Sequence, residues 1–253
     1  MKYKYLLFDL DNTLYPSTAA IDKGITHRML SFIASYLHIS YEEAIAKRNS
    51  RLPFYGTTLE WLRAEEGLKD IHSFFNAVHP PEEIEEIPFD AHLRPFLQSL
   101  HMPMAVLTNA PMVHAKRILD FLNVTDLFTG IYDVECNNLK GKPYPQAFYN
   151  ALEGSNFSLK ETLFFDDHKK YTDGYQVLGG QAILVQHPQN AGISHPLDAQ
   201  SHGDSPNRNN SHVLKSPGSK DPSLKAQEQE SQGPEQITIG SIYEIPELLK
   251  KLE

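Results

Sequence analysis

Residues 8–15 read FDLDNTLY and overlap the end of an apolar run, residues 3–8, that is typical of a buried strand. The two acids of this stretch, Asp9 and Asp11, stand two residues apart where the strand ends. Side chains at i and i+2 of a strand point to the same side, so both carboxylates can converge on one point. In open α/β sheets, ligands bind at the carboxyl ends of the strands. Alternatively, the acids belong to a capped turn, because Asp and Asn are good turn and N-cap residues.

The composition of the chain excludes several classes of protein. With 253 residues, of which 40% are hydrophobic, the chain can bury an α/β core and an accessory subdomain. A net charge of −9 argues against general nucleic-acid binding, which needs clustered Lys and Arg. No apolar run approaches the roughly 20 residues of a membrane span, and no secretory signal is recognisable. The single cysteine, Cys136, suits a reducing compartment, so we expect a cytoplasmic protein that binds neither nucleic acid nor membrane.

Strand-like runs alternate with helical patterns along the chain. This alternation predicts an α/β fold, a doubly wound parallel sheet with right-handed crossovers. The further expected elements are strands at 102–109, 130–133, 162–167, 181–185 and 237–240, and helices at 113–122 and 245–252.

Two regions depart from this alternation. Residues 18–88 contain only amphipathic helical stretches, at 21–37, 41–47, 58–65 and 71–78. They predict a helical cap inserted after the first strand of a Rossmann-like core, which comprises residues 1–17, 89–186 and 236–253. Residues 187–235 have no aromatic side chain and are rich in Pro, Ser, Asn, Gln and Gly, so we interpret them as a disordered insertion.

Two of the remaining polar segments suit a phosphoryl group. Thr108 and Asn109 end the second strand, where a hydroxyl and an amide can hydrogen-bond phosphoryl oxygens, although they can also cap the next helix. Lys142 stands between Gly141 and Pro143. Its ammonium suits a phosphate or a nearby carboxylate, and the alternative is an exposed lysine in a turn.

The last polar segment consists of Asp166 and Asp167, which follow an apolar run. Adjacent acids repel each other unless a cation is bound, and Mg²⁺ in proteins is commonly held by one or two carboxylates. An exposed acidic turn is the alternative. The twelve histidines show no metal-ligand spacing, so the sequence predicts no metal site from them.

The order Asp-x-Asp, Thr-Asn, Lys-Pro, Asp-Asp resembles the haloacid dehalogenase-like hydrolase superfamily over the whole chain apart from residues 187–235. In that superfamily, members that dehalogenate carbon lack an acid at the position of Asp11, whereas members that act on phosphate esters carry it. A finer resemblance, to the pyrimidine 5′-nucleotidase branch, rests on residues 9–16 (DLDNTLYP), 55–59 (YGTTL), 78–79 (VH) and 108–115 (TNAPMVHA). His168, where the branch usually has Ser, and Trp61, where small residues are common, depart from it.

The superfamily resemblance implies a Mg²⁺-dependent phosphomonoesterase. Asp9 would attack phosphorus and become an aspartyl-phosphate, while Asp11 would protonate the leaving oxygen and then activate water. The implied metal ligands are Asp9, the main-chain carbonyl of Asp11, Asp166 and Asp167. The implied phosphate-binding residues are Thr108, Asn109 and Lys142, of which Lys142 also serves catalysis by offsetting the negative charge of the site.

The branch resemblance implies a small phosphomonoester as substrate, a pyrimidine nucleoside 5′-monophosphate above all. We expect selectivity to come from the cap, through the aromatic pair Phe54 and Tyr55 and through Thr57 and Thr58. The alternative for the aromatic pair is packing within the cap. Two other functions stay open: a phosphosugar mutase that uses the same aspartyl-phosphate, and a nucleotide-binding or regulatory protein without catalysis. The sequence does not determine the oligomeric state.

Overall fold

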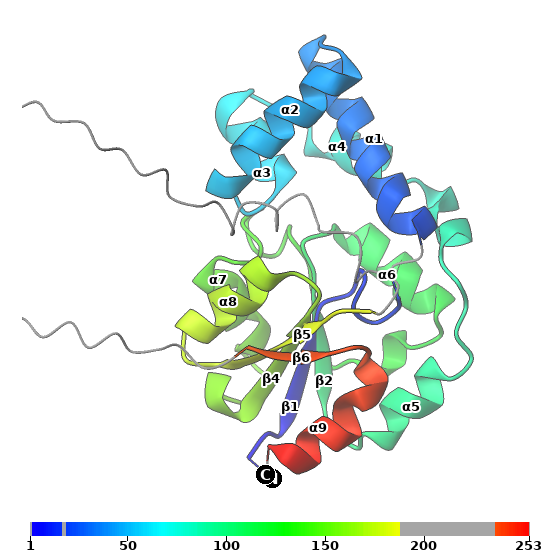
Figure 1. Cartoon of the computed structure of the whole chain (residues 1–253), viewed down its shortest axis with the longest axis vertical. Coiled ribbons are helices and arrows are strands. Elements are labelled where there is room, and N and C mark those ends of the chain that lie inside the picture. Colours follow the sequence, from blue (N-terminus) through cyan, green and yellow to red (C-terminus); the bar gives the residue numbers. More distant parts are fainter. Residues whose placement is uncertain (1, 17–18, 188–235, 253) are drawn as a thin grey trace, which may run out of the picture.

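The computed structural model describes residues 2–16, 19–187 and 236–252, and within them six strands form one sheet (Figure 1). The strand order is β3-β2-β1-β4-β5-β6, and every neighbouring pair is parallel. The strands are β1 (Tyr5–Phe8), β2 (Met104–Leu107), β3 (Ile131–Tyr132), β4 (Thr162–Asp166), β5 (Gln181–Val185) and β6 (Ile237–Ile239). The predicted doubly wound α/β fold is confirmed.

The two faces of the sheet are covered by different helices, because alternate residues of each strand point to opposite faces. Leu6 and Phe8 of β1 pack in a cluster with α5 (Leu93–Ser99), α6 (Met112–Phe121) and α9 (Ile245–Lys251). Tyr5 and Leu7 pack on the other face with α7 (Pro145–Leu152) and α8 (Lys169–Val177). All four residues of β1 are buried, as expected for a central parallel strand.

Four α-helices lie between β1 and α5 along the chain: α1 (Ala19–Leu37), α2 (Tyr41–Arg51), α3 (Thr58–Glu65) and α4 (Ile71–Val78). Side-chain oxygens of Ser40, Thr57 and Asp70 cap α2, α3 and α4, which fixes where each begins. The helices share a hydrophobic cluster of their own, in which Trp61 is fully buried. Figure 1 shows this group, called the cap below, beyond the carboxyl ends of the strands.

The boundaries of several elements differ from those expected. The strands expected at 3–8 and 102–109 are shorter, because only Tyr5–Phe8 and Met104–Leu107 pair with neighbours. β5, α3 and α4 have the expected bounds. Of the insertion expected at 187–235, residues 188–235 lie outside the described residues, whereas His187 is described and buried.

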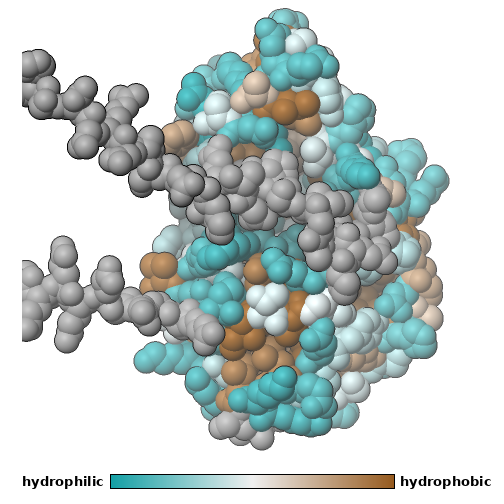
Figure 2. All heavy atoms as spheres, in the orientation of Figure 1, coloured by the Kyte–Doolittle hydropathy of each residue, from teal (hydrophilic) through white to brown (hydrophobic). Residues whose placement is uncertain are grey.

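The surface of the described residues is mostly polar on the face shown in Figure 2, with hydrophobic residues gathered in its lower half, near β6 and α9. Among the described helices, none combines the length and the apolar character that crossing a membrane requires.

The strand order places one edge of the sheet opposite the cap. β1 lies between β2 and β4. After β1 the chain forms β2 and β3 on one side of it, and then crosses to the other side to form β4, β5 and β6. The carboxyl ends of β1, β2 and β4 therefore meet at this switch point, where open α/β sheets bind ligands.

Candidate active site

A cavity of about 210 Å³ lies between the cap and the carboxyl ends of the strands. It brings together residues that are far apart in the sequence. Among the predicted site residues, those that line it are Asp9, Asp11, Thr57, Thr58, Thr108, Asn109, Lys142 and Asp167. Asp166 is fully buried and contacts the site through Lys142, whereas Phe54 and Tyr55 do not line this cavity.

Lys142 is buried between two carboxylates. Its Nζ atom donates to Oδ1 of Asp9 and to Oδ2 of Asp166, each at 2.6 Å. Burial lowers the pKa of Lys142, but the charges of Asp166 and Asp9 outweigh burial and hold the pKa above its usual range. Burial raises the pKa of Asp9 to about 7, even though Lys142 opposes the shift. The ammonium is therefore charged and fixed at the bottom of the cavity, and it is not an exposed turn lysine.

Three carboxylates form a group that can hold a metal ion. Ligand oxygens of Asp9, Asp166 and Asp167 lie within 4.8 Å of one another. Burial, and then the charges of Asp166 and Asp9, raise the pKa of Asp167 well above its usual range. A set of hard oxygen donors whose negative charge is only partly compensated, by Lys142, matches the preference of Mg²⁺. The residues present therefore fit the metal that the sequence implied.

The carboxylate of Asp11 has other hydrogen-bond partners than that group. Its Oδ1 accepts hydrogen bonds from the Tyr15 hydroxyl at 2.5 Å and from Nε2 of His114 at 2.8 Å. Burial raises the pKa of Asp11, but the neighbouring His114 and Tyr15 outweigh burial and lower it. The two acids of the Asp-x-Asp stretch thus have different surroundings: Asp9 faces Lys142, and Asp11 faces a histidine and a tyrosine.

The side chain of Asn109 makes two hydrogen bonds with the main chain of Lys142. Its Oδ1 accepts from the main-chain N–H of Lys142 at 2.7 Å, and its Nδ2 donates to the main-chain carbonyl of Lys142 at 2.9 Å. This double contact fixes the loop that carries Lys142. Asn109 also lines the cavity and its Nδ2 atom has a second N–H, so the expected contact with phosphoryl oxygens stays a prediction. Thr108 is buried, and its hydroxyl accepts from the main-chain N–H of Ala110 at 3.0 Å.

The cap loop contributes its threonines to the cavity. Thr57 caps α3, and the hydroxyl of Thr58 accepts from Nε of Arg48 at 3.0 Å. Phe54 is exposed, and the hydroxyl of Tyr55 donates to Glu65 at 2.9 Å on the surface of the cap. Neither aromatic side chain lines the cavity, and Tyr55 packs against the cap cluster, in agreement with the alternative interpretation of the pair.

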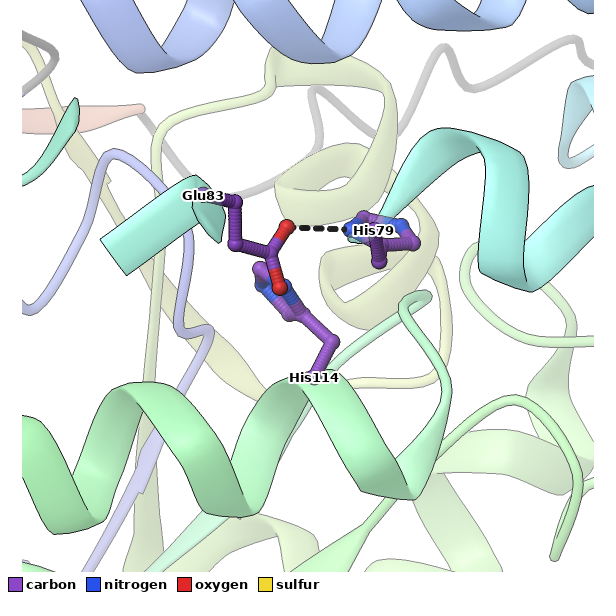
Figure 3. A group of neighbouring side chains, drawn as sticks. All are labelled: His79, Glu83 and His114. Atoms are coloured by element: carbon purple, nitrogen blue, oxygen red, sulfur yellow. Dashed lines mark hydrogen bonds and ion pairs between the residues drawn. The ribbon is translucent and has the colours of Figure 1, made fainter. Parts of the chain in front are cut away.

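The structure also brings together residues that the sequence analysis missed. His79, Glu83 and His114 are buried side by side, and Figure 3 shows both imidazoles beside the Glu83 carboxylate. The spacing of four residues between His79 and Glu83 is not a helical repeat, because α4 ends before His79 and Glu83 lies in a separate 3₁₀ segment, Pro81–Glu86. Nothing local connected them to His114, which lies 31 residues beyond Glu83.

The two departures from the branch pattern have different positions. Trp61 packs in the cap cluster and does not line the cavity. His168 does line it, its main-chain N–H donates to Oδ1 of Asp166 at 2.8 Å, and its ring lies 4.7 Å from that of Tyr171. His168 therefore helps to orient Asp166 through its main chain, a role that does not depend on the side chain.

Comparison with known proteins agrees with this arrangement. The haloacid dehalogenase-like hydrolase family matches the chain over residues 3–170. A HAD phosphatase from Thermococcus onnurineus has a similar structure, with 17% identity, coverage of 97% of both chains and a TM-score of 0.58. L-2-haloacid dehalogenase from Xanthobacter autotrophicus is also similar, with 14% identity, coverage of 99% of this chain and 100% of the other, and a TM-score of 0.55.

A predicted phosphatase from Clostridium acetobutylicum is 19% identical and has a TM-score of 0.51, with coverage of 73% of this chain and 85% of the other. Since phosphatases and a dehalogenase both share the fold at this low identity, the structural likeness defines the fold alone. The family match extends over most of the chain. The chain belongs to the haloacid dehalogenase-like hydrolase family.

Proposed function

We propose that this hydrolase is a phosphomonoesterase in which Asp9 is the nucleophile and Asp11 the general acid and base. The observation that carries the proposal is that Asp11 lines the same cavity as Asp9 while no described residue donates to its Oδ2. A carboxyl oxygen in this position can give a proton to a leaving alcohol. Family members that dehalogenate carbon lack an acid at this position, so the presence of Asp11 favours phosphate esters.

The side chains of the cavity have separate tasks in this mechanism. Oδ1 of Asp9 is held by Lys142, whereas among the described residues Oδ2 has only a long 3.4 Å contact with the Thr13 hydroxyl, so Oδ2 is the oxygen available to attack phosphorus. Asp11 protonates the leaving alkoxide as the P–O bond breaks. Asp11 then takes a proton from the water that hydrolyses the aspartyl-phosphate, while Lys142 offsets negative charge at the bottom of the cavity.

A metal ion has a defined place in this proposal. Asp9, Asp166 and Asp167 would hold Mg²⁺, and when bound it supplies charge neutralisation for the phosphoryl oxygens.

The cavity supports a compact leaving group. At about 210 Å³, its volume lies below the range of roughly 300–1,000 Å³ that is common for small-molecule sites. Apolar side chains of the cap line it, namely Ile25, Met29, Phe74 and Phe75. A small cavity with an apolar wall suits a ribose and a single-ring base better than a ribose and a two-ring base. We therefore propose pyrimidine nucleoside 5′-monophosphates as the substrate class.

The test is phosphate release from CMP, UMP, AMP, GMP and glycerol phosphate, with Mg²⁺ and with EDTA, beside an Asp9→Asn variant. We expect release that needs Mg²⁺, is absent in the variant, and is faster for the pyrimidine than for the purine nucleotides. Equal rates for both classes of base would contradict the substrate proposal only. If the folded wild-type protein releases no phosphate from any ester, the proposal that it is a phosphomonoesterase is wrong.

A further inference from the structure

The two hydrogen bonds to the Asp11 carboxylate both go to one oxygen. Nε2 of His114 lies 2.8 Å from Oδ1, and the hydroxyl of Tyr15 donates to the same atom at 2.5 Å. With Oδ1 held from two sides, rotation of the carboxyl group is restricted. Asp11 lines the cavity, and no described residue donates a hydrogen bond to its Oδ2, so this oxygen stays available to a ligand.

The His114 imidazole is itself held on its other side. Its Nδ1 lies 2.8 Å from Oε1 of Glu83, and both side chains are fully buried. Glu83 as a carboxylate only accepts hydrogen bonds, and Oδ1 of Asp11 accepts whether or not Oδ2 carries a proton. Both ring nitrogens of His114 therefore carry a proton, and the ring is a cation. A continuous row of charge-assisted hydrogen bonds therefore runs from Glu83 through His114 to Asp11.

Glu83 connects this row to the cap. It lies in the 3₁₀ segment η2 (Pro81–Glu86), which follows the last cap helix, α4, along the chain. Its Oε2 lies 3.0 Å from Nδ1 of His79, which directly follows α4, as Figure 3 shows. Arg117 of α6 donates to Oε1 of Glu83 at 2.5 Å, and to the main-chain carbonyls of His79 and Pro80 at 3.2 Å each. The segment that leads from the cap to the core is thus hydrogen-bonded to Arg117 together with Glu83, the residue that contacts His114.

The His79, Glu83 and His114 side chains also lie close enough to share a metal ion, with ligand atoms within 4.8 Å of one another. Their hydrogen bonds argue against one. Arg117 already places a cation on Oε1 of Glu83, and both nitrogens of His114 are engaged by carboxylates, which leaves no lone pair on this ring for a metal. The group is therefore arranged for hydrogen bonding.

We propose that His114 and Glu83 are positioning residues for Asp11: Glu83 fixes the His114 imidazole, and His114 fixes the Asp11 carboxyl with Oδ2 facing the leaving group of the substrate. The inference rests on the proposed phosphomonoesterase and names two residues of its mechanism. Asp11 acts in the form that has taken a proton from solvent onto Oδ2, while Oδ1 still accepts from His114. As the P–O bond breaks and Asp9 binds phosphorus, this proton passes to the leaving oxygen, which departs as the alcohol. The carboxylate that remains lies beside the imidazolium of His114.

If His114 and Glu83 position Asp11, the loss of kcat/KM in their variants should depend on the leaving group of the ester. An alkyl phosphate needs a proton on its leaving oxygen, whereas p-nitrophenyl phosphate releases a stable anion that hardly needs one. The second-order constant kcat/KM covers the steps up to departure of the alcohol, so the ratio of kcat/KM for the alkyl ester to that for the aryl ester measures general acid catalysis. A loss of folded protein lowers both constants equally and leaves this ratio unchanged.

The test measures this ratio, for ethyl phosphate over p-nitrophenyl phosphate, in the wild type and in the variants Asp11→Asn, Glu83→Gln, His114→Asn and His114→Gln. Asn places its amide near Nδ1 and loses the contact with Asp11, whereas the longer Gln can place a donor near Nε2. We expect the ratio to fall roughly 10²-fold in Asp11→Asn and in His114→Asn, to fall less in Glu83→Gln, and to recover in large part in His114→Gln.

The outcomes separate the inference from the proposed function. An unchanged ratio in His114→Asn, with a reduced ratio in Asp11→Asn, would overturn the positioning role and leave the esterase intact. Equal reductions in His114→Asn and His114→Gln would also overturn it, since contact with Asp11 would then be irrelevant. No phosphate release from either ester by the wild type would overturn the proposed function and the inference with it.

Discussion

Nζ of Lys142 lies 2.6 Å from Oδ1 of Asp9, although 133 residues separate the two along the chain. The same ammonium lies 2.6 Å from Asp166. One cation thus connects the ends of β1 and β4 with the loop before α7. The two carboxylates can be buried close together because this cation lies between them.

Removal of that ammonium should destabilise the fold. Lys142→Met leaves Asp9 and Asp166 buried without their common partner, and we expect a loss of about 3–5 kcal/mol in the free energy of unfolding. Urea unfolding monitored by circular dichroism measures this loss. The matched control is Lys169→Met, which removes an exposed ion pair with Asp173 and should cost less than about 1 kcal/mol. Equal effects of both variants would contradict the role of the buried pair.

Binding of Mg²⁺ should stabilise the folded protein through Asp167. Negative charge from Asp9, Asp166 and Asp167 is partly uncompensated, so an ion that binds only the folded state raises its stability, by about 2.7 kcal/mol at 100 times Kd. Thermal unfolding with increasing MgCl₂ should show a rising Tm for the wild type and a much smaller rise for Asp167→Asn. Asp173→Asn, at an exposed acid outside the site, should respond like the wild type. A rise that Asp167→Asn leaves unchanged would place the ion elsewhere.

The stability contributed by His114 should depend on pH in a defined direction. Burial lowers the pKa of His114, but Asp11 and Glu83 outweigh burial and raise it from 6.5 to about 9. Because the folded-state pKa is the higher one, this contribution is complete below pH 6.5 and is lost as pH rises through about 9. Each pKa unit is worth about 1.4 kcal/mol, so the full contribution is roughly 3 kcal/mol.

The measurement for His114 is the difference in unfolding free energy between the wild type and His114→Asn, at pH values between 6 and 10. This difference should shrink as pH rises from about 7 to 10, since the other titrating groups are common to both proteins. A difference that stays constant over this range would show that His114 does not carry the charge.

A methyl group at Gly141 should disturb Lys142 through Asn109. A Cβ atom on Gly141 would lie 1.9 Å from Oδ1 of Asn109, which must therefore move from its two hydrogen bonds with the main chain of Lys142. We expect Gly141→Ala to lower kcat at least tenfold, since misplacing a positioned group is costly to catalysis. The double variant with Asn109→Ala should be no slower than Asn109→Ala alone. Additive losses would mean that Gly141 acts on something other than Asn109.

The fold, and the position of several acidic residues at the ends of strands, could be predicted from the sequence alone. β5, α3 and α4 have their expected bounds because turn and capping residues mark them locally. Asp9 and Asp166 could be associated because each stands where a recognisable strand ends, and because parallel strands bring such ends to one edge. Lys142 was associated with them only through the order of motifs that resembles the superfamily.

The sequence did not indicate the roles of Asn109 and His114, because both depend on contacts across the fold. Asn109 is engaged by a main-chain segment 33 residues away, which no local pattern specifies. His114 lies on a helix face whose neighbours, Asp11 and Glu83, are 103 and 31 residues distant. The positions of Phe54 and Tyr55 likewise follow from how the cap packs, which composition leaves open.

The central claim is that Asp9 carries the phosphoryl group during turnover. It is tested most directly by mixing the protein with p-nitrophenyl phosphate and Mg²⁺, quenching in acid, and locating the phosphoryl group by peptide mass spectrometry. The account predicts one added phosphoryl group on the peptide that contains Asp9, and none in Asp9→Asn, which releases no phosphate. Phosphate release that persists in Asp9→Asn, with no phosphoryl group on that peptide in the wild type, would contradict it.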